Sequence, residues 1–134
     1  MAPQGHAVIS AGIGALVWYL TRSVAGAVTA LAVGVFMDAD HVLDYLWIWR
    51  GRTDQLWVPL HSYELAVPMV IATWLSNWSP LLLAATLAHL GHLVTDQLSN
   101  SLSNPLVYFL TYRAWHKFRV RYRRRYCPVL RRRR

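Results

Sequence analysis

This chain of 134 residues has few charged side chains, a single cysteine, and no Asp, Glu, Lys or Arg in its first 21 positions. The one cysteine, Cys127, excludes an intramolecular disulfide framework and a zinc site built from several cysteines. Because no Lys or Arg precedes the apolar run 7–20, that run lacks the basic segment that begins a secretory signal peptide. The chain also has no glycine-rich nucleotide-binding loop and no internal repeat. We therefore interpret residues 7–20 as part of a first membrane helix.

The charged residues that are present are sorted along the chain. Of the 14 basic residues, Arg22, Arg50 and Arg52 precede residue 113, and all the others lie in 113–134. All six acidic residues and five of the six histidines lie before residue 100. A soluble protein spreads charges of both signs over its surface, whereas these acids lie close to histidines. We divide the chain into a membrane helical domain over 1–112, which carries a polar site, and a basic tail over 113–134.

Four apolar stretches approach the roughly 20 residues that a helix needs to cross a hydrocarbon core of about 30 Å. They cover residues 3–21, 24–49, 57–78 and 80–99, and a fifth apolar segment, 106–112, is too short to span. Gly12 and Gly14 in the first stretch favour close packing on a neighbouring helix. The sequence thus predicts an all-α integral membrane bundle of about four short transmembrane helices, followed by a short C-terminal apolar segment and the basic tail.

His89, His92 and Asp96 stand at the end of the fourth apolar stretch. At 3.6 residues per turn, positions i, i+3 and i+7 lie within roughly 60° of each other on a helix, so the three side chains share one face. Ionisable groups in an apolar segment are costly, and they usually mark a site or an ion path. The alternatives are a buried hydrogen-bonded pair for His92 and Asp96, and a packing or supporting role for His89.

An up-and-down arrangement with short connections brings the other polar residues to the same side. His6 then begins the first helix, the residues from Asp38 to Asp44 end the second, and His61 and Glu64 begin the third. Shared divalent cations would offset the desolvation cost of several kcal/mol for each such group. Nitrogen and oxygen ligands without thiolates suit Zn, Mn or Fe, with Mg as a further candidate. The ligand supply is large enough for two divalent metal ions.

Three blocks of the sequence match a family pattern: Met37-Asp38-Ala39-Asp40-His41, His61-Ser62, and His92-Leu93-Val94-Thr95-Asp96. With an N-terminal His and Pro105 downstream, residues 5–108 resemble the LexA-regulated, membrane-bound metal-dependent hydrolases of bacteria. The His-x-x-x-Asp block is also similar to one in zinc-dependent phospholipases C. The sequence departs from the family pattern in having Met37 for the usual Pro and in lacking the first half of an H-R-G-x-T-H-S block. The resemblance implies a location in the bacterial inner (plasma) membrane, and it implies the metal-site candidates His6, Asp38, Asp40, His41, His61, His92 and Asp96.

The helical face adds His89 to these metal-ligand candidates. Asp40, Asp44 and Glu64 are our catalytic candidates, each as a general base that accepts a proton from water. Asp44 lies one turn beyond Asp40, so it could instead ligate a metal or orient a ligand. The less specific alternatives are a carboxylate cluster at a helix end for Asp38 to His41, and a solvated interfacial carboxylate for Glu64.

The expected activity is hydrolysis of a phosphoester in a lipid or lipid-linked substrate by metal-activated water, since paired metal ions are common in this chemistry. A second hypothesis is a non-enzymatic proton or metal-ion carrier that uses the same histidines and aspartates as a relay. It predicts polar residues through to the far side, whereas residues 7–20 and 24–37 contain no Asp, Glu, His, Lys or Arg. A third is a small membrane subunit whose tail recruits a partner or lipid.

The basic tail indicates a membrane partner. Polybasic segments beside a membrane bind anionic lipid headgroups at roughly 1 kcal/mol per basic residue. The interleaved Phe118, Tyr122 and Tyr126 could instead stack on nucleic acid, which is the weaker interpretation. The positive-inside rule places the tail in the cytoplasm. If residues 106–112 do not cross the membrane, the polar site also faces the cytoplasm, and we favour that orientation over the outward-facing one.

Overall fold

The computed structural model describes residues 3–49, 56–99 and 104–119, and this part of the chain is helical, with no strand. Four helices of 13 to 20 residues and several shorter ones follow one another in this part of the chain. They are α1 (Pro3–Thr21), α2 (Val24–Phe36), the 3₁₀ helix η1 (Met37–Asp40), α3 (His41–Trp49), α4 (Tyr63–Leu75), α5 (Pro80–Ser99), the 3₁₀ helix η2 (Pro105–Tyr108) and α6 (Leu110–Trp115).

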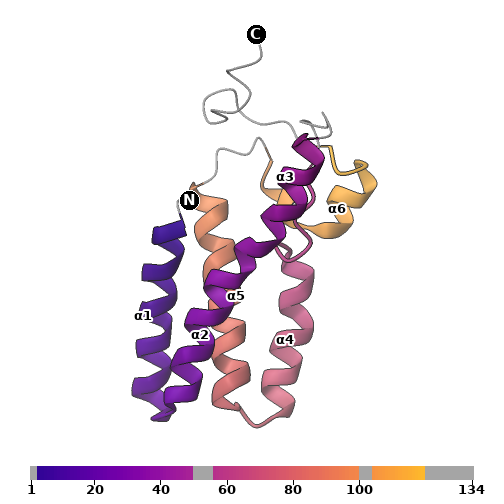
Figure 1. Ribbon diagram of the computed structural model, residues 1–134. Helices are drawn as coiled ribbons and strands as arrows, with labels where there is room; N and C mark the ends of the chain where they lie inside the picture. The colour runs from indigo at the N-terminus through magenta and orange to yellow at the C-terminus, as the bar shows by residue number, and fades with distance from the viewer. Residues whose placement is uncertain (1–2, 50–55, 100–103, 120–134) are drawn as a thin grey trace.

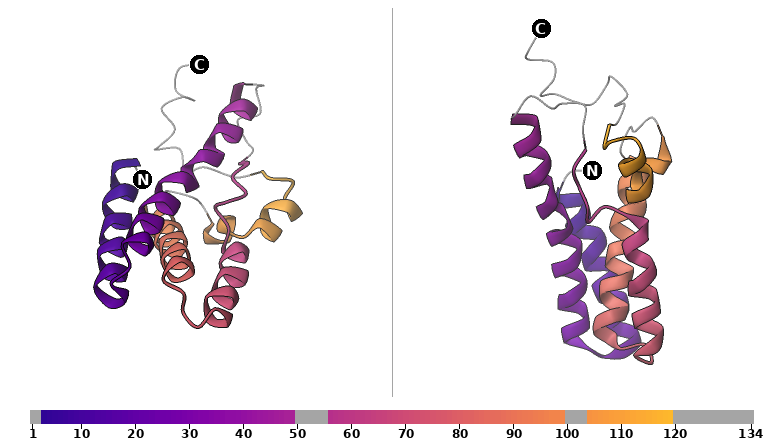
Figure 2. Two further views of the ribbon diagram at one scale, coloured as in Figure 1. Left: turned by 60° about the horizontal axis from the view of Figure 1, so that its bottom comes forward. Right: turned by 90° about the vertical axis from the view of Figure 1, so that its right-hand side faces the viewer.

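The helices form a bundle with two different ends (Figures 1 and 2). Helices α1, α2 and α5 pack on one another, and α4 packs on α5. One end carries the tight α1–α2 and α4–α5 connections, and we call it the turn end. The other end carries the start of α1, the end of α5, and the short elements α3 and α6. We call it the site end, because the polar residues gather there.

The observed helices agree with the predicted ones at the first and fourth stretches and differ at the other two. Helices α1 and α5 have the predicted bounds. The second stretch continues to Trp49, but its helix tightens to 3₁₀ geometry over η1. The third helix was predicted from residue 57 and begins only at Tyr63, after Ser62 in an extended conformation. Pro59 disfavours helical geometry at Val58 alone, and the contacts of His61 with Asp38 and Asp40 hold the following residues outside the helix.

One helical stretch of the described residues, Val24–Leu43, is long and apolar enough to cross a membrane by length and composition. Helix α4 is also apolar, but it has 13 residues and rises only about 20 Å. The four-helix arrangement is therefore observed, whereas one stretch of it alone passes this test for a membrane span.

Small residues allow the close approach of α1, α2 and α5. The core between them is built from Val17, Ala30, Ala84 and Ala88, which have no exposed surface. A Cβ atom on Gly14 would lie 2.9 Å from the carbonyl oxygen of Ala27, so this glycine supports the predicted close packing. Gly12, predicted to act in the same way, has open space beside it.

Candidate metal centre

Six histidine and aspartate side chains converge at the site end. Three overlapping groups each bring their ligand atoms within 4.8 Å of one another: His6, Asp38 and His92; Asp38, His41 and His61; and His61, His92 and Asp96. These residues come from α1, η1, α3, α5 and the segment before α4. The predicted meeting of the polar residues on one side of the bundle is therefore observed.

His61 and His92 form the centre of the group. Their Nε2 atoms lie 3.1 Å apart. His92 Nδ1 lies 2.9 Å from the carbonyl oxygen of Gly34, and His61 Nδ1 lies 3.0 Å and 3.2 Å from the two carboxylate oxygens of Asp40. A ring nitrogen that faces such an acceptor carries the proton, so both rings donate through Nδ1 and, when neutral, present a lone pair at Nε2. Two lone pairs face each other, which requires a cation or a proton between them.

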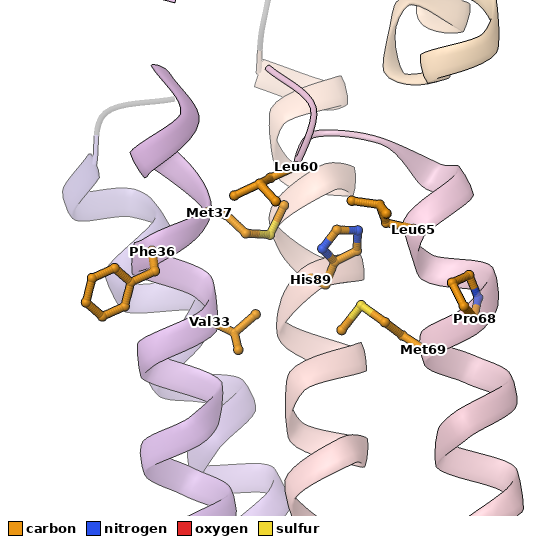
Figure 3. A pocket seen from close by; sticks show the side chains of 8 residues that line it. All are labelled: Val33, Phe36, Met37, Leu60, Leu65, Pro68, Met69 and His89. Carbon is orange, nitrogen blue, oxygen red and sulfur yellow. The ribbon is translucent and has the colours of Figure 1, made fainter. Parts of the chain in front are cut away.

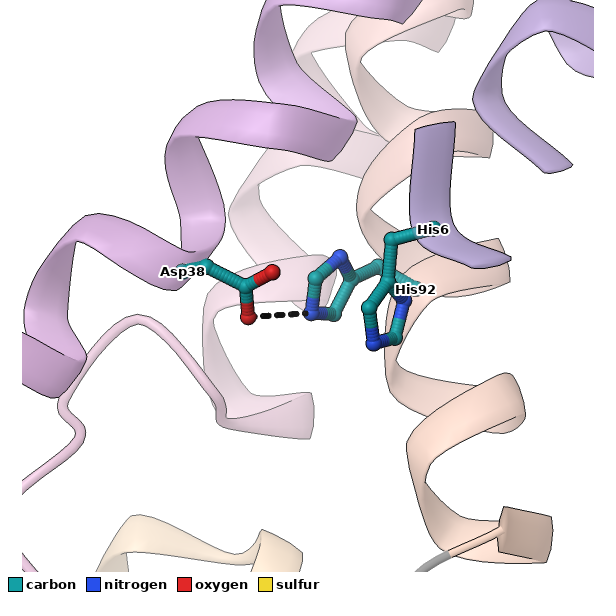
Figure 4. Close-up of side chains that lie close together, drawn as sticks. All are labelled: His6, Asp38 and His92. Atoms are coloured by element: carbon teal, nitrogen blue, oxygen red, sulfur yellow. Dashed lines mark ion pairs between the residues drawn. The ribbon is translucent and has the colours of Figure 1, made fainter. Parts of the chain in front are cut away.

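Two carboxylates complete the surroundings of these nitrogens. Asp38 Oδ1 lies 3.4 Å from His92 Nε2 and 3.6 Å from His61 Nε2. Asp96 Oδ2 lies 3.5 Å from His61 Nε2, while its Oδ1 lies 3.0 Å from His6 Nε2. Figure 4 shows Asp38 directed at His92, with the ring of His6 stacked on that of His92 at a centroid distance of 3.8 Å. The group therefore has more hydrogen-bond acceptors than donors, and its carboxylates carry negative charge.

The spacing of these atoms fits a bound metal ion. With metal–ligand bonds of 2.0–2.1 Å in tetrahedral geometry, neighbouring ligand atoms lie about 3.3 Å apart. The distances between His61, His92, Asp38 and Asp96 given above bracket this value. The bonds at Nδ1 are of the kind that orient metal-ligating histidines and fix their tautomer. The residues present are thus compatible in type, spacing and tautomer with a divalent cation.

The group is closed on one side and open on the other. His6, His61, His92 and Asp96 are buried, each at most 3% exposed. Asp38 and His41 are partly exposed, with side-chain values of 26% and 40%. A small molecule would therefore approach from the side of η1 and the start of α3.

Asp40 supports the group without belonging to it. Its carboxylate accepts the backbone N–H of Leu60 at 2.8 Å as well as contacting His61 Nδ1. The 3₁₀ geometry of η1 lets Asp38 reach His61 at Nε2 while Asp40 holds the opposite edge of the same ring. The two aspartates that the sequence grouped together therefore have different positions, one facing the converging nitrogens and one behind them.

Of the other predicted residues, His89 and Glu64 lie outside the three groups. His89 Nε2 lies 3.2 Å from the carbonyl oxygen of Ser62, outside the three groups. Glu64 accepts the backbone N–H groups of Leu110 and Thr111 at 2.8 Å and 2.9 Å, so it caps the start of α6. The backbone of Asp44 belongs to α3, and its side chain lies outside the described part of the structure.

Arg113 is a supporting residue that the sequence did not indicate. It is 1% exposed, and its guanidinium donates to the carbonyl oxygens of Val58 at 2.7 Å and His61 at 3.0 Å. Burial lowers the pKa of Arg113, while the charges of Asp40 and Glu64 act in the opposite direction. Arg113 is the first residue of the basic segment 113–134, and the composition of that segment suggested a solvated tail. Its burial follows from α6, which folds back over the segment that carries His61.

No protein-family model matches this sequence, and comparison with curated proteins and with solved structures gives no significant match.

Proposed function

We propose that this protein is a metal-dependent hydrolase embedded in a membrane, and that it cleaves a phosphoester in a lipid or lipid-linked substrate. The observation that carries the proposal is the pair of Nε2 atoms of His61 and His92, 3.1 Å apart, with both Nδ1 atoms already engaged. Buried carboxylate charge beside this pair would be costly without a cation. The resemblance to bacterial membrane-bound metal-dependent hydrolases, which includes these residues, supports the same conclusion.

Two divalent ions suit the six ligands better than one, since a structural or catalytic zinc takes about four ligands. Asp38 belongs to both the group with His6 and His92 and the group with His41 and His61, and its Oδ1 atom is the one that lies near His41, His61 and His92, so Asp38 would be shared between the two groups. Zn, Mn or Fe suits these ligands, with Mg as a further candidate. Such ions lower the pKa of a bound water toward ~7 and stabilise charge on phosphoryl oxygens.

The polar residues of the site end have different proposed roles. Asp40 holds the ring of His61, and Arg113 holds the backbone that carries it. Asp38 and His41 line the open side, where a phosphoester would approach. Asp44, one turn after Asp40 in the sequence, remains our candidate general base, while Glu64 has a structural role at α6. The reaction would then occur where the headgroup of a lipid meets the bundle.

The exposed surface of the bundle supports a membrane location for all four long segments. Large apolar side chains are exposed along each helix, which is unusual for a surface in contact with water. Examples are Val8, Leu16, Val28, Leu31, Val35, Val67, Val70, Ile71, Leu81 and Leu82. We propose that α1, α2 with η1, α4 and α5 cross the bilayer, which would thin beside the short α4. The aromatic side chains of Trp18, Tyr19, Trp74 and Trp78 near the turn end would then lie in the interface.

The proposed orientation puts the site end and the basic tail at the cytoplasmic face of a bacterial inner membrane. The basic residues after the buried Arg113 would bind anionic lipid headgroups there, and residues 120–134 lie outside the described part of the structure. Across the described residues, every buried titratable side chain belongs to the site end or to the elements that support it. This distribution favours a hydrolase over a proton or metal-ion carrier, because a carrier needs such groups along its whole path.

The test is hydrolysis by the purified full-length protein in vesicles of phosphatidylethanolamine and phosphatidylglycerol. Mass spectrometry of the lipid extract should detect a product that has lost a headgroup or a phosphate. A chelator should abolish its formation and added Zn²⁺ or Mn²⁺ should restore it. Asp38→Asn should reduce the rate at least tenfold, while Val70→Ala on the exposed face of α4 should not. Metal binding without any product from these lipids would contradict the proposal for this lipid class and favour the carrier.

A further inference from the structure

An apolar cleft lies between α2 and α4, directly below the metal-ligand group. Figure 3 shows Val33 and Met37 facing Leu65 and Met69 across the cleft, with His89 of α5 between them and Leu60 above. Its volume is about 350 Å³. An apolar protein cavity of ~150 Å³ already holds a benzene molecule. The cleft is therefore large enough for a segment of a hydrocarbon chain.

The upper end of the cleft reaches three segments that carry metal-ligand candidates. Met37 directly precedes Asp38, and Leu60 directly precedes His61. His89 lies one turn before His92 on α5, and its Nε2 atom lies within hydrogen-bond distance of the carbonyl oxygen of Ser62. The rim of the cleft is therefore continuous with the open side of the metal-ligand group, where Asp38 is partly exposed.

The chemistry of the lining selects an apolar occupant. The only titratable side chain in the lining is His89, whose Nε2 atom is engaged with a backbone carbonyl. Leu65 and Leu60, on the side of α4 and the segment before it, are 36% and 40% exposed. The cleft thus opens sideways between α2 and α4, where Phe36, which also lines it, is 70% exposed. A lipid chain could enter from the bilayer without crossing a polar barrier.

We propose that this cleft holds the hydrocarbon chain of the substrate, with the phosphoester of the same molecule at the metal-ligand group. The position of the phosphoester rests on the proposed function, whereas chain binding depends on the cleft alone. The substrate is then an amphiphile with a phosphoester at the end of an aliphatic chain, taken laterally from the membrane. The cleft adds selectivity for chain length and for the absence of polar groups along the first part of the chain.

Photolabelling tests chain binding independently of hydrolysis. The protein in phosphatidylcholine nanodiscs is irradiated with an alkyl phosphate that carries a diazirine in its chain, with and without excess hexadecyl phosphate as competitor. We expect competitor-sensitive labelling at Val33, Leu65 and Met69. At Val70, which faces the lipid, labelling should not respond to the competitor. Equal response at Val70, or none in the cleft, would overturn the proposal.

Filling the cleft gives a matched pair of variants. Met69→Trp places a larger side chain in the cleft, and Val70→Trp places the same side chain on the exposed face of the same helix. Competitor-sensitive labelling should fall at least fivefold in Met69→Trp and persist in Val70→Trp. Leu65→Trp, at the opening, should reproduce the loss, and unchanged metal content in all three variants serves as the check of folding. Labelling that persists in both cleft variants would overturn the proposal.

A kinetic arm separates failure of the cleft from failure of the proposed function. For methyl and decyl p-nitrophenyl phosphate diesters, Met69→Trp should lower kcat/KM about tenfold for the decyl ester and leave the methyl ester unchanged. An equal loss for both esters would overturn the proposal, since the change would then act through the metal-ligand group. If the wild-type protein hydrolyses neither ester while the cleft labelling is specific, the hydrolase assignment fails and the chain site stands.

Discussion

The two ends of the bundle bury polar side chains in different ways. Near the turn end, the hydroxyl of Thr73 donates to the carbonyl oxygen of Met69 at 2.8 Å and accepts from Thr86 at 2.9 Å. Thr73 therefore donates and accepts one bond, and neither threonine introduces a charge. At the site end, His61 and His92 present facing Nε2 atoms and Asp96 adds a buried carboxylate. At the turn end, the protein itself supplies the hydrogen-bond partners of the buried hydroxyls. At the site end, the buried side chains have more hydrogen-bond acceptors than donors.

This difference separates a structural polar contact from a site. A buried hydroxyl pair costs little once both groups are bonded, whereas a buried group with excess acceptors and charge is destabilising until a cation enters. Changes at the site end should therefore alter metal binding more than folding. Changes at the turn end should alter folding alone.

The largest effect is expected from Asp96→Asn. This substitution keeps the shape of the side chain and removes the buried negative charge that lies near His6 and His61. Zn²⁺ affinity should fall at least a hundredfold, measured by competition with a chromophoric chelator. Thr86→Val on the same helix is the matched control and should bind Zn²⁺ as the wild type does. Equal affinities in the two variants would contradict the distinction between the ends.

Asp40→Asn tests the carboxylate that contacts His61 at Nδ1, on the side of the ring away from the proposed metal. The amide can still contact Leu60 or His61, but it no longer carries the charge that holds the tautomer of His61. Loss of such a partner typically costs 10–100-fold in metal affinity. The same competition assay should place Asp40→Asn between the wild type and Asp96→Asn. An affinity loss larger than that of Asp96→Asn would indicate that Asp40 is itself a ligand.

Arg113→Met should loosen the segment that carries His61. It removes donors from the buried carbonyl oxygens of Val58 and His61, each of which then costs about 1–3 kcal/mol. We expect a lower thermal unfolding midpoint by circular dichroism and a Zn²⁺ affinity reduced about tenfold. Arg119→Met, in the exposed segment after α6, is the control. If both variants behave as the wild type does, the α6 contact has no role in the site.

The smallest effect is expected at the turn end. Thr73→Val removes one interhelical hydrogen bond, worth about 0.6 kcal/mol on average within a membrane. The unfolding midpoint should fall slightly, while Zn²⁺ affinity stays within twofold of the wild type. A tenfold change in affinity would mean that the two ends are coupled.

The sequence predicted the helices where the pattern is local. The bounds of α1 and α5 follow from long apolar runs that adjoin turns with Arg22 or Asn77 in left-handed geometry. The start of α4 was predicted too early, because residues 57–62 are apolar enough to continue a helix and yet hold His61 against η1. Tertiary contacts decided that boundary.

The arrangement of the site was likewise predicted where it follows from the sequence pattern, and not where it depends on tertiary contacts. Alternating helices predicted which residues meet, since His6, Asp38, His61 and Asp96 each lie at a helix end on one side. The sequence could not separate Asp38 from Asp40, because their placement on either edge of His61 depends on the 3₁₀ turn. It also could not identify the carbonyl of Gly34, since a backbone acceptor has no residue type to recognise.

The central claim is that the converging side chains at the site end hold metal ions. The most direct measurement is the metal content of the detergent-purified protein by elemental mass spectrometry, beside His92→Ala and His89→Ala, with circular dichroism as the check of folding. His89 is one turn from His92 and lies outside the three ligand groups. We predict one to two equivalents of a transition metal in the wild type and in His89→Ala, and less than a tenth of that in His92→Ala. A folded wild-type protein that stays metal-free after addition of Zn²⁺, Mn²⁺ and Mg²⁺ would contradict the account.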